Sequence, residues 1–314
     1  MSIEINVTTA DTPRITFDEA RKRVSEMNLI NGFMFDSVLE DEEKGSIVVK
    51  GILDTVLDMD VPIGNVRSQK VLSGLDSIYH GIRFDVCIDK QKNNNSNATI
   101  YDIEMEDRAA DKEELPKRGR YYQGVCDSKK LPSGHSYLEL PDYVSITILS
   151  YDPFEAGDMY YEVNSKITTH PQIEYKDGIR RIFLYGRGKN NLKNKKEYGE
   201  RLKEMLEYIV TGQLKANPCE IVTKMEEAVS ETKKRAEVTE RYMQRWDEIE
   251  HIKRDVREET RKLVTEEVTK EVTDTVNRLN LILIESGRLD DLTRAAKEPE
   301  YQKKLIEELL TEKM

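Results

Sequence analysis

The sequence contains no apolar run that approaches the roughly 18 residues needed to span a membrane. Its first residues, MSIEINVTTADTPRITF, have no basic segment followed by a hydrophobic stretch, which a secretory signal requires. These two absences exclude the patterns of membrane-spanning and exported proteins. We therefore expect a cytoplasmic protein with no membrane partner.

Cysteine and histidine, which are common metal ligands, are scarce. The sequence has three cysteines, an odd number without the C-x-x-C spacing of a zinc site: Cys87, Cys126 and Cys219. The four histidines are scattered along the chain, at His80, His135, His170 and His251. A disulfide framework and a cysteine zinc site are therefore not expected, and a bound metal would have to be held by oxygen ligands.

The charge of the chain is acidic overall but unevenly distributed. The formal net charge is −11, which argues against a nucleic-acid partner because phosphate binding depends on Lys and Arg. The segment 180–203, however, contains nine Lys or Arg and only two Glu. It offers DNA a local basic surface, although a solvated helix or loop would have the same composition.

Alternating helix and strand patterns predict an α/β or α+β core over residues 1–217. Thr16 and Glu19 have the spacing of a capping box, and the apolar periodicity of residues 33–57 indicates two more helices. After Pro62 we expect short strands in IRFDVCID, TIYDIEME, YVSITILSYDPF and RIFLYG, with the polar loop KQKNNNSNA after the first and the helix LPKRGRYYQGVCDSKKL after the second. Strands and helices in this mixed order build a sheet with helical layers.

The C-terminal part of the chain has the pattern of a long helix. The segment Asn-Pro-Cys-Glu at 217–220 combines an N-cap, a proline at the first helical position and an acidic first turn. No further proline or glycine occurs before Gly287. We expect one long helix over 218–286 and a small helical tail over 287–314.

The predicted long helix carries an apolar stripe. Its members follow one another mostly in steps of three and four residues: Tyr242, Trp246, Ile249, Val264, Val268, Val272, Val276, Leu279 and Leu283. The steps do not form a clean heptad, so the number of partner helices stays open. Most helical stability comes from packing an apolar face, and no other predicted helix is long enough to cover this one. We expect a homo-dimer or higher homo-oligomer through 218–286; folding back onto the core is the alternative.

Three carboxylates alternate with apolar side chains in the strand TIYDIEME. Because strand side chains alternate between two faces, Asp102, Glu104 and Glu106 would project from the same face. Like charges two residues apart repel each other, so the pattern predicts a positive group among them. An exposed strand with a solvated acidic face is the alternative interpretation.

Asp85 and Glu104 lie symmetrically about the polar loop, because the midpoint of their numbers falls between Asn94 and Asn95. A symmetric hairpin would place the two carboxylates opposite each other, with Cβ atoms about 5 Å apart. This spacing suits one hard cation, Mg²⁺ or alternatively Mn²⁺, which needs few protein ligands besides water and substrate phosphate. The metal would promote phosphodiester hydrolysis. A chance pairing and a two-carboxylate glycosidase are the alternatives.

Residues 16–212 contain an ordered series of motifs: FMFDSVLED, GIRFDVCID, IYDIEME, LPKRGRYYQG, LPSGHSYLELPDYVSITILSYDPF and YKDGIRRIFLYGRG. The series resembles the bacterial recombination-promoting nucleases, also described as transposase-like proteins, of the PD-(D/E)XK nuclease superfamily. The resemblance implies a restriction-endonuclease-like core, in which helices flank a mixed central sheet and the active site lies on a hairpin. It also implies a Mg²⁺-dependent DNA endonuclease that serves recombination, mobile-element biology or phage defence.

The resemblance assigns roles to three acidic residues. Asp85 matches the metal-binding Asp of the family motif, and Glu104 matches its second acidic ligand. Glu106 stands where the superfamily has Lys and this family often has Gln, so it would be a further ligand, a general base or a mark of lost activity. A second departure lies at Asn31, before FMF, where relatives often carry an acidic residue; this puts any helper carboxylate from that helix in doubt.

The segment KRGRYYQ supplies candidate cations beside the acidic strand. Arg118 and Arg120 would hold the DNA backbone or stabilise transition-state charge, because a guanidinium presents a planar fork of donors. Pairing of one Arg with the acidic face is equally consistent with the sequence. Tyr122 and Gln123 fit packing and supporting roles better than catalysis.

Two functions from different classes remain. The leading hypothesis is a metal-dependent DNA endonuclease, which Asp85 and Glu104 favour. The other is a catalytically inactive nuclease-fold protein that binds DNA or a partner and oligomerises through its C-terminal helix, which Glu106 favours.

Overall fold

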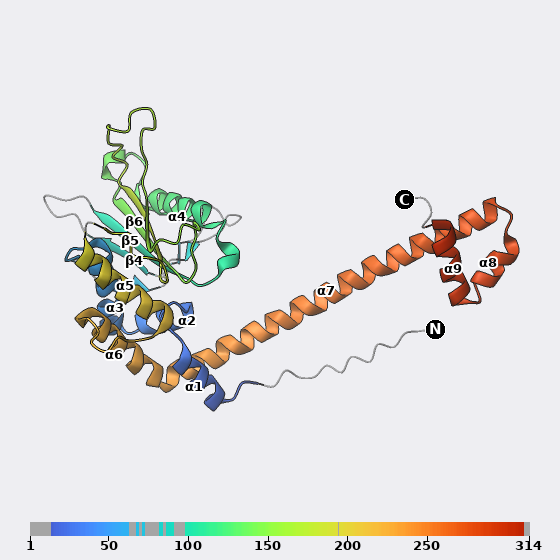
Figure 1. Cartoon of the computed structure of the whole chain (residues 1–314), viewed down its shortest axis with the longest axis horizontal. Coiled ribbons are helices and arrows are strands. Elements are labelled where there is room, and N and C mark those ends of the chain that lie inside the picture. Colours follow the sequence, from blue (N-terminus) through green and yellow to red (C-terminus); the bar gives the residue numbers. More distant parts are fainter. Residues whose placement is uncertain are drawn as a thin grey trace. The chain divides into compact units, whose positions relative to one another are not determined.

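The computed structural model describes residues 14–62, 67–68, 71–72, 82–83, 86–90, 98–193 and 195–310, with the backbone alone between residues 67 and 90. The chain forms two compact units (Figure 1). One comprises Ile15–Met243 and contains the sheet, and the other contains the chain from Gln244 onwards. No helix within the described ranges combines the length and the apolarity that a membrane crossing requires.

Three capped helices open the first unit: α1 (Phe17–Glu26), α2 (Gly32–Leu39) and α3 (Glu42–Leu57). The Oγ1 atom of Thr16 accepts a hydrogen bond of 3.2 Å from the backbone N–H of Glu19, which confirms the predicted helix start. Asn31 and Asp41 cap the next two helices in the same way. The two helices predicted within residues 33–57 are therefore also confirmed.

The described strands form a mixed sheet of six strands and a separate pair. Their order across the sheet is β1 (Arg67–Ser68), β4 (Val86–Lys90), β5 (Thr99–Glu106), β6 (Asp142–Leu149), β8 (Ile179–Tyr185) and β7 (Tyr160–Val163). The pairs β1–β4, β4–β5 and β8–β7 are antiparallel, whereas β5–β6 and β6–β8 are parallel. The separate antiparallel pair joins β2 (Val71–Leu72) to β3 (Ile82–Arg83).

Helices cover both faces of the mixed sheet (Figure 1). One face packs into the main core with residues of α2, α3, α5 (Lys196–Thr211) and α6 (Glu220–Lys234). The other face lies under α4 (Leu115–Lys130), where Ile100 and Tyr143 of the sheet pack against Val125 and Cys126. Two short 3₁₀ helices, η1 (Ala109–Asp111) and η2 (Tyr137–Glu139), flank α4 in the sequence. The predicted α/β class, a mixed sheet between helices, is confirmed.

The single helix predicted over residues 218–286 is wrong at Arg235. This residue has extended dihedral angles (φ −72°, ψ 130°) and separates α6 from α7 (Ala236–Glu285). The buried side chains of α6 join the main core, and they include Val222, Met225, Ala228 and Val229. As a result, the unit that contains the sheet extends to Met243, beyond the predicted boundary at residue 217.

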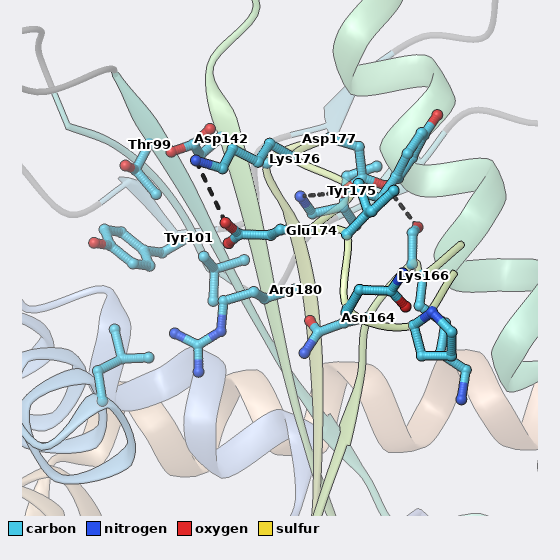
Figure 2. Close-up of a pocket in the computed structure, with 18 of the residues that line it drawn as sticks. Thr99, Tyr101, Asp142, Asn164, Lys166, Glu174, Tyr175, Lys176, Asp177 and Arg180 are labelled. Atoms are coloured by element: carbon cyan, nitrogen blue, oxygen red, sulfur yellow. Dashed lines mark hydrogen bonds and ion pairs between the residues drawn. The ribbon is translucent and has the colours of Figure 1, made fainter. Parts of the chain in front are cut away.

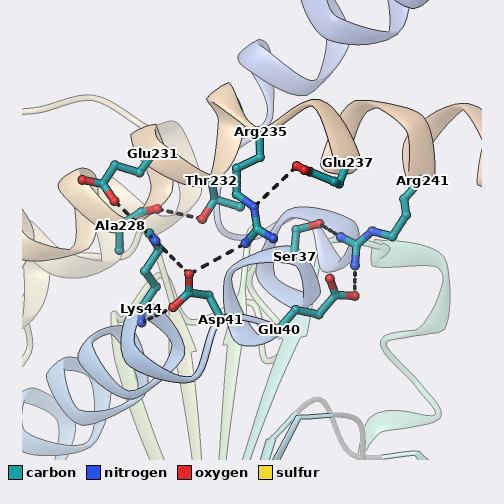
Figure 3. A network of polar contacts seen from close by, with 10 residues as sticks. All are labelled: Ser37, Glu40, Asp41, Lys44, Ala228, Glu231, Thr232, Arg235, Glu237 and Arg241. Atoms are coloured by element: carbon teal, nitrogen blue, oxygen red, sulfur yellow. Dashed lines mark hydrogen bonds and ion pairs between the residues drawn. The ribbon is translucent and has the colours of Figure 1, made fainter.

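A polar network holds the break between α6 and α7 against the α2–α3 corner (Figure 3). The Nη1 atom of Arg235 lies 3.8 Å from Oδ2 of Asp41. Lys44 binds the same carboxylate at 2.8 Å and reaches Glu231 of α6 at 3.3 Å. Because these partners come from distant segments, and neither glycine nor proline marks the break, the local sequence pattern did not predict it.

The apolar stripe of α7 has a different environment at each end. At its start, Val238 and Tyr242 pack on the main core, and the Tyr242 ring lies edge-on to that of Phe33 with centroids 5.4 Å apart. Farther along, the side chains from Ile249 to Val272 in the stripe are exposed. The main core therefore covers the first turns of the predicted stripe.

The last turns of α7 are covered by the C-terminal tail. Leu279 and Leu283 are buried in one cluster with Ala295 and Leu305. The latter two belong to α8 (Leu289–Ala295) and α9 (Pro299–Leu310), which lie within the small helical tail predicted after Gly287. This glycine has a positive φ of 70°, as expected for a residue that ends a helix.

Candidate active site

The three carboxylates of β5 lie on the face that α4 covers. Tyr101, Ile103 and Met105 belong to the main core on the opposite face. Asp102 and Glu106 instead bind residues on the α4 side, as described below. The prediction that the acidic side chains share one face is therefore confirmed, and it follows from the two-residue period of a strand.

The hairpin that carries these residues has the predicted register. In the described part, β4 pairs with β5 from Val86 opposite Ile103 to Lys90 opposite Thr99. Asp85, the first predicted metal ligand, lies outside the described residues. Its predicted position opposite Glu104 therefore stays a prediction.

Asp102 is buried and bound to a tyrosine of the neighbouring strand. Its side chain is 2% exposed, and its Oδ2 atom accepts a hydrogen bond of 2.7 Å from the Tyr143 hydroxyl. Burial, and then the negative charge of Asp102, raise the pKa of Tyr143 above its usual value. Tyr143 therefore stays protonated and remains a hydrogen-bond donor to the carboxylate at neutral pH.

Glu106 is buried and bound to a cation from α4. It is 6% exposed, and its Oε2 atom lies 2.5 Å from Nη2 of Arg118. Its other oxygen accepts a 3.1 Å hydrogen bond from the backbone N–H of Arg108. Burial lowers the pKa of Arg118, but the hydrogen bond and charge of Glu106 outweigh burial, so that the guanidinium pKa lies above its usual value.

This ion pair decides between the alternatives left by the sequence. The sequence predicted a positive group among the carboxylates, and Arg118 is such a group: it binds Glu106 and is itself half-buried. The alternative interpretation, an exposed strand with a solvated acidic face, is wrong because Asp102 and Glu106 are almost fully buried.

Glu104 differs from the other two carboxylates in its exposure. It lies between Asp102 and Glu106 on β5 and is half-buried, with its Oε1 atom shielded from solvent. Its neighbour across the parallel pair is Thr147 of β6, which is buried. Glu104 is therefore the carboxylate of β5 best placed to meet a solvated cation. Within the described ranges, no group of three or more His, Cys, Asp or Glu residues is arranged to hold a metal.

Of the other candidate residues on α4, Tyr122 and Gln123 contact neighbouring side chains, whereas Arg120 faces solvent. Tyr122 packs against the cluster of Ile100 and Tyr143. Gln123 accepts a 2.5 Å hydrogen bond from Nη2 of Arg181 and donates one of 3.2 Å to Asp127. Both contacts fit the predicted supporting roles. Arg120 is exposed and makes no ion pair with the described residues, which leaves its guanidinium available to a ligand.

Sequence reasoning missed the polar residues that β6 and β8 add to this face. Ser145 and Thr147 alternate with Ile146 and Ile148 in the strand, and both polar side chains lie on the α4 side. This two-residue alternation was present in YVSITIL, but the apolar content of the run indicated a strand buried on both faces. Arg181 is paired with Ser145 in the sheet register and could be placed only from the fold.

The basic segment 180–203 is partly neutralised. Arg180 lies 2.9 Å from Glu162, and Lys195 and Arg201 lie 3.2 and 2.8 Å from Asp58. Other cations of the segment are exposed and make no ion pair in the described part of the chain: Arg187, Lys189, Lys193 and Lys196. They are the residues of this segment best able to meet a phosphate backbone.

A separate pocket lies where the parallel strands begin (Figure 2). Thr99, Asp142 and Ile179 line it at the amino ends of β5, β6 and β8, together with residues of the loop 164–178. Tyr101 of β5 also lines it, roughly 10 Å from Glu104 along the strand at about 3.3 Å per residue, but on the opposite face of the sheet. The pocket therefore does not belong to the candidate active site.

The second departure from the resemblance also has a structural role. Asn31 uses its side-chain oxygen to accept hydrogen bonds from the backbone N–H groups of Phe33 and Met34, at 3.1 and 3.4 Å. This side chain caps α2. It supplies no carboxylate, so a helper carboxylate at this position is absent.

Comparison of the chain with protein-family models, curated proteins and solved structures finds no match. The residues of the site and the motif resemblance therefore provide the basis for a proposed function.

Proposed function

We propose that the chain is a metal-dependent DNA endonuclease with a restriction-endonuclease-like core, related to the recombination-promoting nucleases that its motifs resemble. The observation that carries this proposal is the half-buried Glu104, which stands on the hairpin between two carboxylates that are almost fully buried. The mixed sheet between helices and the antiparallel β4–β5 pair support it, because the resemblance places the active site on such a hairpin.

The donor set of the hairpin suits a hard divalent cation. Asp85 and Glu104 would hold Mg²⁺ or Mn²⁺ through carboxylate oxygens, the ligands that these ions prefer. When bound, the ion would polarise a phosphoryl oxygen and lower the pKa of a coordinated water. Glu104 is only half-buried, whereas Asp102 is almost fully buried and binds Tyr143.

Glu106 has a positioning role in this proposal. Two hydrogen bonds, from Arg118 and from the backbone of Arg108, hold its carboxylate under α4. The guanidinium offsets the charge that Glu106 adds beside Glu104, which compensates for the missing Lys of the superfamily. In this proposal Glu106 would act neither as a metal ligand nor as the general base, and Arg118 would orient the acidic face instead of binding the DNA backbone.

Exposed cations supply the DNA contacts. Arg120 on α4 and the unpaired cations of the segment 187–196 are solvent-accessible. Their guanidinium and ammonium groups would bind phosphate oxygens without reading the base sequence. The biological setting, namely recombination, mobile-element biology or phage defence, is part of the same proposal through the motif resemblance.

We also propose that the protein forms a homo-dimer or higher homo-oligomer through α7. The exposed apolar side chains between Ile249 and Val272 support this, because they gain stability only when another surface covers them. An assembly of two copies would contain two sites, which cleavage of both DNA strands requires.

One observation favours the alternative of an inactive nuclease-fold protein that binds DNA or a partner. Glu106 replaces the Lys of the superfamily, and Arg118 is bound to it. Neither residue then offers a cation that is free to orient an attacking water.

A plasmid assay separates the two proposals. The purified full chain is incubated with supercoiled plasmid in Mg²⁺, Mn²⁺ or EDTA. We expect nicked and linear products with a divalent metal and none with EDTA. Retarded plasmid without nicking under every metal condition would contradict the nuclease and support the inactive DNA-binding protein.

A further inference from the structure

The uncovered part of α7 carries a regular apolar row. The row advances in four-residue steps, with Thr260 at one step, through Ile252, Val256, Val264, Val268, Val272 and Val276. The first five of these side chains are 51–61% exposed. A step of four residues exceeds the 3.6 residues of a helical turn, so the row winds slowly around α7. Such a row favours a partner helix that winds around α7 in the right-handed sense over the left-handed supercoil of a heptad repeat.

Charged residues on either side of Val264 have opposite balances. The segment 253–262 contains five Lys or Arg and three acidic residues. The segment 266–274 contains four acidic residues and one Lys. A second copy of α7 that runs in the opposite direction would place the basic segment of each copy beside the acidic segment of the other.

The charges also match residue by residue in this inverted arrangement. In an antiparallel pair centred on Val264, residues equally far before and after Val264 lie at the same level of the two helices. Between Glu250 and Arg278, six pairs of opposite charge then share a level and no pair of like charge does. These pairs are Glu250–Arg278, Arg254–Asp274, Arg257–Glu271, Glu258–Lys270, Arg261–Glu267 and Lys262–Glu266.

The apolar row has the same inverted symmetry. Ile252 shares a level with Val276, Val256 with Val272, and Val264 with its own copy. A parallel pair in register would instead bring each charged residue to the level of the same charge on the partner. Charge and apolar patterns therefore agree on one orientation.

We infer that two copies of the chain pair antiparallel through residues 250–278 of α7, centred on Val264. The contact extends over roughly 42 Å at about 1.5 Å per residue. This inference rests on the proposed self-association and adds its orientation and register. It does not depend on nuclease activity, so its experiments and the plasmid assay fail independently.

Zero-length cross-linking of the unmodified full chain tests the orientation. A carbodiimide joins a Lys only to a carboxylate in contact with it. Lys253 is separated from Glu271 and Asp274 by roughly 27 Å or more along one helix, so these links cannot form within a copy. We expect links from Lys253 to Glu271 or Asp274 in the dimer band. A dimer band whose only links join a Lys to a carboxylate at nearly the same sequence position in the other copy, as a parallel pair would give, would contradict the inference.

Charge reversal tests the register in sedimentation equilibrium. An acidic variant carries Arg254→Glu, Arg257→Glu and Arg261→Glu, and a basic variant carries Glu267→Lys, Glu271→Lys and Asp274→Lys. In a dimer of either variant alone, the three matched pairs join like charges, and the symmetry of the dimer repeats each pair twice. We therefore expect the dimer dissociation constant to rise at least roughly tenfold. A mixture of the two variants restores every pair and should dimerise about as tightly as the wild type.

The control for net charge is the triple variant Lys297→Glu, Lys303→Glu and Lys304→Glu, whose lysines are exposed in the tail beyond α7. It has the same charge change as the acidic variant and should dimerise like the wild type. Wild-type protein that stays monomeric at tens of micromolar would overturn both self-association and its orientation. Variants that dimerise as tightly alone as the wild type would overturn the antiparallel register.

Discussion

Replacing Arg118 by methionine should destabilise the unit that contains the sheet. The substitution keeps a long apolar stem under α4 but removes the cation that lies 2.5 Å from Glu106. Glu106 is 6% exposed, so its carboxylate would stay buried without that partner. Breaking a buried pair in this way costs roughly 3–5 kcal/mol, which changes a folding equilibrium constant more than about a hundredfold.

Two controls separate the buried charge from the loss of an arginine. The double variant Glu106→Met and Arg118→Met removes both charges, and replacement of a buried pair by apolar residues is often close to neutral. It should therefore be more stable than Arg118→Met alone. Arg294→Met breaks the pair of Arg294 with Glu298, in which both side chains are more than half exposed, and should cost much less stability than Arg118→Met.

Hydrogen–deuterium exchange of β5 measures this effect where it occurs, because the exchange of strand amides reports the free energy of opening. Arg118→Met should accelerate exchange in β5 strongly, and the double variant should recover much of the protection. An Arg118→Met protein that exchanges like Arg294→Met, or a double variant as unprotected as the single one, would refute the reasoning.

Two further predictions concern stability. Burial raises the pKa of Glu162, but hydrogen bonds from Arg180 and two neighbours lower it to about 2 from a usual 4.5. The stabilisation is therefore present above pH 4.5 and lost as the pH falls toward 2, so Glu162→Gln should flatten the acid side of a thermal-melting profile; an unchanged slope would contradict this. Gly188→Ala would place a Cβ 2.5 Å from backbone atoms of Met159, so it should lower the free energy of unfolding in urea by about 1–3 kcal/mol. A Cβ at Gly124 on α4 meets no atom within 4 Å, so Gly124→Ala should raise the free energy of unfolding by up to about 1 kcal/mol. Equal effects of the two substitutions would show that the close approach at Gly188 is unimportant.

The sequence predicted the local features of the site well because short-range periodicity determines them. The alternation of β5 placed Asp102, Glu104 and Glu106 on one face, and the symmetric loop predicted the register seen from Val86 opposite Ile103 onwards. The cap at Thr16 could also be predicted from the sequence, because its hydrogen bond joins residues only three positions apart.

The partners of these residues could not be predicted because they depend on how distant segments meet. Tyr143 is 41 positions from Asp102 and reaches it only through the parallel pairing of β5 with β6. Arg118 was one of two candidate cations, and the strand–helix packing selected it for Glu106. The break at Arg235 likewise depends on contacts with the α2–α3 corner.

The rate of metal-dependent plasmid nicking by Glu104→Gln tests the central claim most directly. Glutamine keeps the size of the side chain at this half-buried position and removes the carboxylate that would hold the metal. We expect a loss of at least roughly a hundredfold, the same loss for Asp85→Asn, and a melting temperature equal to or above that of the wild type. The exposed Glu113→Gln is the matched control and should cut at the wild-type rate. If Glu104→Gln and Asp85→Asn both nick plasmid as fast as this control, the hairpin is not the active site.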